Sequence, residues 1–210
     1  MWHDFDYFID KGDEYYHIKD FNSAIIEYSK AIKKEPNNIT GYIRRGNAYD
    51  KNEDFEAAIQ DYTIALTLPP MGIIEGKKYN SHISAFSSRA HTLVNLKKFK
   101  EAENDCYAAL KIDPLFIPCL VTLGKIFQIY GNNREAIKYY SKIHRIDPNC
   151  ELGYWYRGDL YKDLGKYERA IEDYKKVLEI DPDNEFMKDD IADCLDLLVE
   201  NEVNSMEDDL

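Results

Sequence analysis

The chain has 210 residues, and its 39 acidic and 27 basic side chains give a formal net charge of −12 at pH 7. This acidity argues against a nucleic-acid-binding protein, which needs a basic surface to neutralise phosphates, and against docking onto anionic lipid. Apolar residues make up 44% of the chain, while glycine (10) and proline (7) are scarce, a composition that favours a helical protein with a buried core.

The sequence is expected to encode a cytoplasmic protein without a targeting segment. Its first residues, Met-Trp-His-Asp-Phe-Asp, have neither the basic nor the apolar part of a secretory signal. The longest apolar stretch, Leu115 to Gly124, is interrupted by Pro118 and is shorter than the ~18 residues of a membrane span. The four cysteines form no CxxC pair, so we expect reduced thiols that serve packing.

Five prolines recur at intervals of 34, 44, 34 and 34 residues, and they are Pro36, Pro70, Pro114, Pro148 and Pro182. A small residue lies 24 positions before each of them: Gly12, Gly46, Ala90, Gly124 and Gly158. An alanine lies twelve positions before each: Ala24, Ala58, Ala102, Ala136 and Ala170. The residue eight positions before is Tyr28, Tyr62, Cys106, Tyr140 or Tyr174. Four independent positions therefore define one internal repeat.

The repeated pattern predicts a helix, a turn and a second helix. Small residues let two helices approach closely, and the aromatic four positions after the alanine lies on the same helical face. The proline ends the second helix because its ring cannot continue the backbone hydrogen bonding. Such a unit buries its apolar surface only by stacking on neighbours, which predicts a solenoid.

These residues resemble the tetratricopeptide repeat, in which a small residue, an aromatic, an alanine, a second aromatic and a proline follow one another at this spacing. The resemblance covers residues 5–38, 39–72, 83–116, 117–150 and 151–184. It implies an all-α fold, a right-handed superhelical α-solenoid of antiparallel helix pairs. We expect one solenoid domain over residues 1–199, and no strand.

Three further segments and positions complete the prediction. Residues 73–82 form a ten-residue insertion, expected to be a loop that leads into an extended helix. Residues 185–199 are expected to form a capping helix, and residues 200–210 an acidic, flexible tail. One position before the small residue, four repeats carry a base, and we expect its aliphatic stem to lie along the interface while the charge reaches water: Lys11, Arg45, Arg89 and Arg157.

No pattern of catalytic residues stands out. The sequence lacks GxSxG, HExxH, a phosphate-binding glycine loop and paired Cys/His spacing, and its five histidines are scattered. Close carboxylates are frequent, but solvated helix faces explain them in a chain this acidic. We predict a protein that is not an enzyme and that uses no cofactor and no metal.

Function is therefore expected on the concave surface, which the first helices of the repeats line. It runs from acidic residues in the first repeat, through a polar and modestly basic middle, to aromatic residues in the fifth. Trp155 follows Tyr154, which already occupies the packing position, so Trp155 is expected to point into the groove. The candidate partner-binding residues are Arg44, Asn47, Lys51, Ser88, His91, Lys125, Trp155 and Tyr156.

The charged candidates allow two interpretations. They either pair with carboxylates on adjacent helices or steer a partner segment that carries acids or a free carboxylate. One known way to hold such a segment is the carboxylate clamp, with which some tetratricopeptide repeats grip the tails of heat-shock chaperones. The positions that the clamp requires match in no register, and Asn47 is the single agreement in the best one. Capture of chaperone tails is therefore disfavoured.

We predict a non-catalytic scaffold that holds an extended segment or helix of a partner protein in its groove. Two alternatives remain open at this point. One is a chaperone for a secreted or assembling client, for which Ile9, Ile43, Val121 and Trp155 offer apolar surface. The other is an accessory or sensory subunit of an enzyme or regulatory complex. The sequence does not name the partner.

Overall fold

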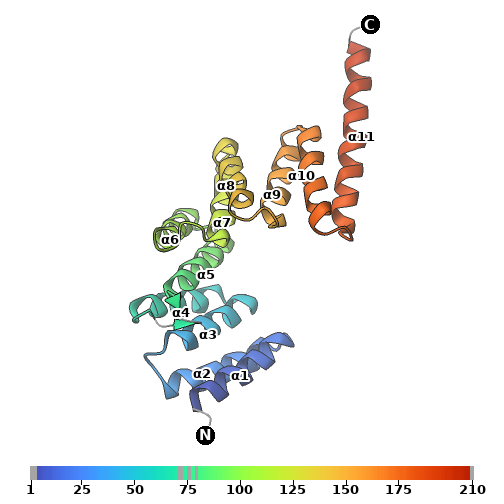
Figure 1. Cartoon of the computed structure of the whole chain (residues 1–210). Coiled ribbons are helices and arrows are strands. Elements are labelled where there is room, and N and C mark those ends of the chain that lie inside the picture. Colours follow the sequence, from blue (N-terminus) through green and yellow to red (C-terminus); the bar gives the residue numbers. More distant parts are fainter. Residues whose placement is uncertain (1–3, 71–72, 75–76, 79, 209–210) are drawn as a thin grey trace. The chain divides into compact units, whose positions relative to one another are not determined.

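The computed structural model describes residues 4–70, 73–74, 77–78 and 80–208, with side chains for 4–70 and 80–201. These residues form an all-α fold of antiparallel helix pairs, as predicted (Figure 1). The helices are α1 (Asp4–His17), α2 (Phe21–Lys34), α3 (Ile39–Lys51), α4 (Phe55–Thr67), α5 (Ser81–Asn95), α6 (Phe99–Ile112), α7 (Ile117–Ile129), α8 (Asn133–Ile146), α9 (Glu151–Asp163), α10 (Tyr167–Ile180) and α11 (Glu185–Asp208). The pairs α1–α2, α3–α4, α5–α6, α7–α8 and α9–α10 coincide with the five predicted repeats.

The chain divides into two compact units, residues 1–119 and 120–210, where the sequence pattern predicts a single solenoid. Unit 1 contains the first three helix pairs, and unit 2 contains the last pairs and α11. The division falls inside the first helix of the fourth repeat. The fourth repeat also departs from the repeated residue pattern, as described below.

Side-chain caps begin several of the helices. Asp20, Asn38, Asp54, Asn80 and Asn132 each accept a hydrogen bond from a backbone N–H in the first turn of the helix that follows. These bonds satisfy donors that the helix itself leaves without a partner. Short polar residues therefore set where α2, α3, α4, α5 and α8 start.

The turn between the two helices of every repeat contains one residue in the left-handed region. Its φ is 63° at Lys19, 62° at Glu53, 58° at Lys97, 72° at Gly131 and 66° at Gly165. All five residues lie 17 positions before a repeat proline. Glycine adopts this conformation without strain, whereas Lys and Glu do so at a cost, so the turn geometry is imposed by the packing of the two helices.

The repeated glycine and tyrosine contact each other directly. A Cβ atom placed on Gly46 or Gly158 would lie 2.7 Å from the ring of Tyr62 or Tyr174. Those rings are 1% and 0% exposed. The second helix can therefore approach the first only where the side chain is a hydrogen atom. In the third repeat the pair changes together, to Ala90 and Cys106, so a larger first residue faces a smaller second one.

Arg45, Arg89 and Arg157 form a repeated ion pair instead of carrying their charges to water. Arg45 Nε and Nη2 donate to the two carboxylate oxygens of Asp61 at 2.7 and 2.8 Å, and Nη1 donates to Ser29 Oγ of the preceding repeat at 3.0 Å. Arg89 binds Asp105 and Thr63 in the same way, and Arg157 binds Asp173 and Ser141. The prediction was wrong because it considered the cation alone. Each guanidinium has a buried carboxylate within bidentate reach.

The first and fourth repeats modify this Arg–Asp pair. In the first repeat, Lys11 Nζ lies 3.6 Å from Glu27 Oε1, so a weaker pair of a cation and a carboxylate occupies the same two positions. In the fourth repeat the register places Leu123 and Tyr139 at the two positions. Tyr139 stacks on Phe127, with ring centroids 5.5 Å apart. The fourth repeat, at which the chain divides, therefore replaces the ion pair with apolar packing.

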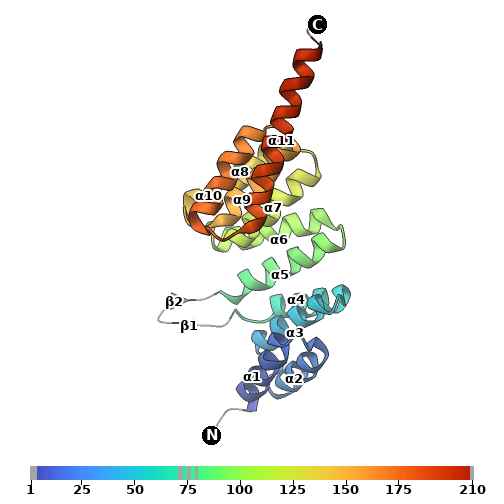
Figure 2. The same ribbon diagram turned by 90° about the vertical axis from the view of Figure 1, so that its right-hand side faces the viewer.

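The insertion and the C-terminal helix both differ from the prediction. Within the insertion 73–82, Ile73–Ile74 (β1) and Lys77–Lys78 (β2) pair as antiparallel strands, so the prediction that strand is absent was wrong (Figure 2). Ser81 and His82 already belong to α5. Residues 75–76 and 79 lie outside the described residues. The capping helix does not end at residue 199. It continues to Asp208 through the stretch expected to be a flexible tail, because residues 185–208 contain no glycine or proline to stop it.

Candidate functional site

A cleft of about 680 Å³ opens on the first helices of unit 1. Helices α1, α3 and α5 supply its walls, and Phe116, which precedes α7, closes one side. Its apolar lining consists of Phe5, Ile9, Ile43 and Phe116, and its polar lining of Asp6, Asn38, Thr40, Arg44, Asn47, Ser81, Ser84, Ser87 and Ser88. The cleft thus combines an apolar floor with many hydrogen-bonding groups.

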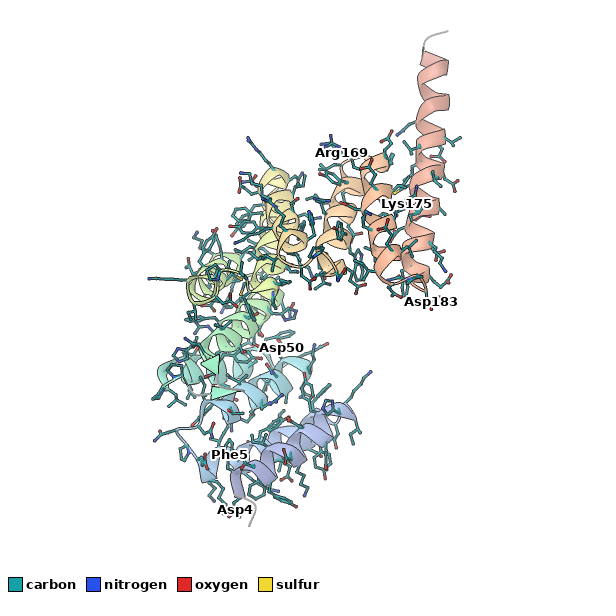
Figure 3. All side chains as sticks on the ribbon, in the orientation of Figure 1. Asp4, Phe5, Asp50, Arg169, Lys175 and Asp183 are labelled. Atoms are coloured by element: carbon teal, nitrogen blue, oxygen red, sulfur yellow. The ribbon has the colours of Figure 1, made fainter. Side chains whose placement is uncertain are left out.

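The floor is formed by side chains that the core already holds in place. Phe5 and Ile9 are 6% and 8% exposed, and they pack in the cluster that includes Tyr28 and Ala48. Ile43 and Phe116 are half-buried. Because these side chains are fixed by packing on one side, their cleft-facing surfaces form a rigid apolar surface. Phe5 on α1 is labelled in Figure 3.

The cleft carries charges of both signs, because Asp6 and Arg44 both line it, and its positive part lies on α3 and α5. Helices α3 and α5 begin at the cleft with Asn38, Thr40 and Ser81, and neither helix has an acidic residue in its first turn. The N-terminal end of a helix carries a partial positive charge. Arg44 adds a full charge, and its side chain is 47% exposed.

Arg44 and Asn47 are held by neighbouring side chains. Arg44 Nη2 lies 3.6 Å from Asp13 Oδ2, and the Tyr28 hydroxyl donates to the other oxygen of Asp13 at 2.6 Å. In the next repeat the Tyr62 hydroxyl donates to Asn47 Oδ1 at 2.8 Å. The buried tyrosines therefore orient the groups on the concave face. Burial raises the pKa of Tyr62, and the nearby Asp50 carboxylate raises it further, so this phenol stays a neutral donor.

A second polar group lies toward the C-terminal ends of α3 and α5. Thr92 Oγ1 donates to Asp50 Oδ1, and Asp50 Oδ2 lies 3.9 Å from His91 Nδ1. Asp50 is labelled in Figure 3. Lys51, the last residue of α3, is exposed. The Arg44 guanidinium and the His91 ring are thus both close to carboxylates, which is the first of the two interpretations that the sequence allowed.

The eight predicted residues divide between the two units. Arg44, Asn47 and Ser88 line the cleft of unit 1, whereas Lys51 and His91 lie farther along the same helices. The remaining three predicted residues, Lys125, Trp155 and Tyr156, belong to unit 2.

In unit 2, Trp155 and Lys125 both lie against the Tyr156 ring, and these three residues are called the aromatic group of unit 2. Tyr156 stacks between Tyr140 and Trp155, with ring centroids 5.7 Å from each. Lys125 Nζ lies 4.3 Å from the centroid of the Tyr156 ring. Trp155 is half-buried and packs against the cluster that includes Tyr174 and Met187, so only part of its surface is available to a partner.

Sequence reasoning missed several lining residues. The prediction identified concave-face positions by counting along each first helix from its packing aromatic. In the first repeat this count includes Asp6 and Ile9, but it does not include Phe5 in the first turn. Phe116 lies between two repeats, two residues after Pro114, where the other repeats carry Asn, Gly or Cys. A large aromatic at that single repeat position was a signal that could have been used.

The described residues contain no group of three or more His, Cys, Asp or Glu side chains placed to hold a metal ion. None of their helices combines the length and apolar composition required to cross a membrane.

Among known proteins, one relative is the DnaJ homolog subfamily C member 7 homolog of Dictyostelium discoideum. It is 31% identical over 75 residues, which make up 36% of this chain and 14% of that protein. The chain thus matches about one seventh of the length of this relative.

Two solved structures share the fold. A tetratricopeptide repeat protein from Parabacteroides merdae has a TM-score of 0.70 at 21% identity, with 98% of this chain and 77% of that one covered. YrrB, described as a TPR protein with an unusual peptide-binding site, has a TM-score of 0.58 at 20% identity, with 86% and 88% covered.

Family models agree with these structural matches. Models described as tetratricopeptide repeat match residues 39–70, 83–114 and 156–184, and a model described as TPR repeat matches residues 12–53. Together they match residues in four of the five predicted repeats, and two of the matches begin where predicted repeats begin, at residues 39 and 83. The chain therefore belongs to the tetratricopeptide repeat family.

Proposed function

We propose that this protein is a non-catalytic binding module that holds a segment of a partner protein in the cleft of unit 1. The observation that carries the proposal is the cleft itself, in which three successive first helices surround a rigid apolar floor. Its volume of about 680 Å³ lies within the ~300–1,000 Å³ of typical ligand sites. Members of this family bind other proteins, and YrrB offers a peptide-binding precedent on the same fold.

The lining indicates what the segment must contain. An apolar side chain fits on Phe5, Ile9 and Ile43, because its burial there removes apolar surface from water on both sides. An acidic side chain or a free carboxylate fits near the first turns of α3 and α5, where helix ends and Arg44 favour negative charge. The serines of α5 supply hydroxyls along the path of an extended backbone.

Binding must compete with the contact between Arg44 and Asp13. A surface pair at 3.6 Å contributes little to stability, so a partner carboxylate can replace it at small cost. Arg44 is therefore expected to act mainly on association and on its salt dependence. The aromatic group of unit 2, with Lys125, Trp155 and Tyr156, remains a predicted second contact.

The test begins with peptides selected from a displayed library against the full chain. Ser84→Arg fills the cleft and is expected to weaken the selected peptides by about tenfold or more, which equals ~1.4 kcal/mol. Arg44→Glu is expected to slow association and to reduce its dependence on salt. Matched controls on the exposed face of α2, Asn22→Arg and Lys33→Glu, should bind as the wild type does.

Two results would contradict the proposal. Peptides that bind Ser84→Arg and Arg44→Glu as tightly as the wild type, with the helix content unchanged by circular dichroism, would place the site elsewhere. A loss of binding in Trp155→Ala alone would move it to unit 2.

A further inference from the structure

Helix α11 carries two apolar rows, and among the residues with described side chains only one of the rows packs in the core of unit 2. The inner row consists of Met187, Ile191, Cys194 and Leu198, which pack in the core cluster of unit 2. The outer row includes Leu195 and Val199, which lie one helical turn apart and are 50% and 59% exposed. The outer row is the unexplained feature of this helix.

The two rows differ in how far they extend. After Leu198 the inner row continues in the sequence with Asn201 and Ser205, so its apolar character stops. The spacing of the outer row recurs at Val203 and Met206. The helix itself runs past the end of α10 as far as Asp208 (Figures 1 and 2). In the sequence, only the outer row therefore continues toward the C-terminal end of α11.

An acidic row borders the outer apolar row. Asp189, Asp193, Asp196 and Glu200 follow one another at helical spacing on the neighbouring face. Asp193 is paired with Lys162, 3.1 Å away, whereas the salt bridges among the described residues do not include the other three. Residues 189–210 contain nine acids and no Lys or Arg.

We propose that the outer face of α11 is a docking surface for an amphipathic helix of a partner protein that carries Lys or Arg beside its apolar row. Apolar residues at alternating three- and four-residue spacing fit between the side chains of a second helix, and the flanking charges select the partner. Two copies of this chain would set acidic rows against each other, so the charge pattern disfavours self-association and favours a basic helix. This surface is separate from the cleft of unit 1.

The experiment uses the full chain and two synthetic peptides of four heptads. Both have Ile and Leu at the core positions, and the flanking positions are Lys in one peptide and Glu in the other. We expect the Lys peptide to bind, with an affinity that falls as salt is raised, and the Glu peptide not to bind. Binding is measured by fluorescence anisotropy at two salt concentrations.

Two double variants separate the apolar and the charged contributions. Leu195→Asp with Val199→Asp should weaken the Lys peptide by about tenfold or more, because it removes the apolar row. Asp196→Lys with Glu200→Lys should weaken it and reverse its salt dependence, and this variant leaves the apolar row intact. Ile26→Asp, an equally exposed apolar residue on α2, is the control that should bind normally.

Three outcomes would overturn the inference. One is equal binding of the Lys peptide to the wild type and to the Leu195/Val199 variant. Another is equal binding of the Lys and Glu peptides. The third is a wild-type dimer in sedimentation equilibrium that the Leu195/Val199 variant dissociates, which would identify a second copy as the occupant.

Discussion

At the scale of single residues, size complementarity between the two helices of a repeat determines the packing. Gly158 faces the Tyr174 ring, and a Cβ on this glycine would lie 2.7 Å from it. The third repeat uses Ala90 and Cys106 at the equivalent positions, both fully buried. The two positions therefore vary as a pair, and each single change is expected to be destabilising.

This pairing predicts non-additive stability. Gly158→Ala should lower the free energy of unfolding by ~1–3 kcal/mol through overpacking. Tyr174→Cys should lower it by ~3–5 kcal/mol through a cavity and the loss of the bond to Asp159. Combined, they copy the third repeat, and urea titrations should give a loss smaller than the sum by about 1 kcal/mol. Strict additivity would show that the two side chains do not share one space.

His144 is expected to make the free energy of unfolding depend on pH with a sign opposite to that of a histidine paired with a carboxylate. Burial lowers its pKa from the ordinary value of 6.5, and the Arg157 guanidinium, 3.2 Å from Nε2, lowers it further. The unfolded chain therefore binds this proton more tightly than the folded chain does. Stability contributed by neutral His144 should be present above about pH 6.5 and should fall as the pH drops toward the lower folded value.

The measurement compares the wild type with His144→Asn in urea titrations at several pH values. The difference between their unfolding free energies should change between about pH 7.5 and 5.5, with the wild type losing more on acidification. A constant difference would mean that His144 does not titrate across this range.

At the scale of helices, the Arg–Asp pair joins the second, third and fifth repeats each to the repeat before it. Arg45 binds Asp61 of its own repeat and Ser29 of the preceding one, so one side chain spans three helices. Asp61 is 3% exposed, which leaves its carboxylate dependent on the guanidinium. Such pairs fix the register of neighbouring repeats more than they add net stability.

Breaking and replacing the pair should therefore have different effects. Arg45→Met leaves a buried carboxylate without its cation and should cost about 3–5 kcal/mol. Arg45→Met combined with Asp61→Leu imitates the apolar fourth repeat and should recover most of that loss. Thermal and urea unfolding followed by circular dichroism measure both. A double variant no more stable than the single one would contradict this account.

At the scale of the whole molecule, stability is expected to be local to each unit. Repeats contact mainly their neighbours, so a defect spreads only as far as the coupling between repeats allows. The fourth repeat has Leu123 and Tyr139 where the second, third and fifth repeats have an Arg–Asp pair, and the division between the units falls in this repeat.

Trp155 provides a probe for one unit. The chain has two tryptophans, so Trp2→Phe leaves Trp155 as a fluorescent reporter of unit 2. In that background, Tyr62→Ala should lower the midpoint of the circular-dichroism transition while the Trp155 transition stays unchanged, and Tyr174→Ala should lower the Trp155 midpoint. Coincident shifts of both signals in both variants would show that the chain unfolds as a single cooperative body.

What the sequence by itself determined was the repeat: its register, its helix pairs and the helical face that holds its small and aromatic residues. These follow from local periodicity, because helical spacing places the repeated positions on one face whatever surrounds them. The tertiary structure alone decided the partners of Arg45, Arg89 and Arg157, the apolar lining with Phe5 and Phe116, and the division into units. Each of these depends on contacts between residues from different helices, and a periodic pattern contains no information about which distant side chains come within hydrogen-bonding or packing distance.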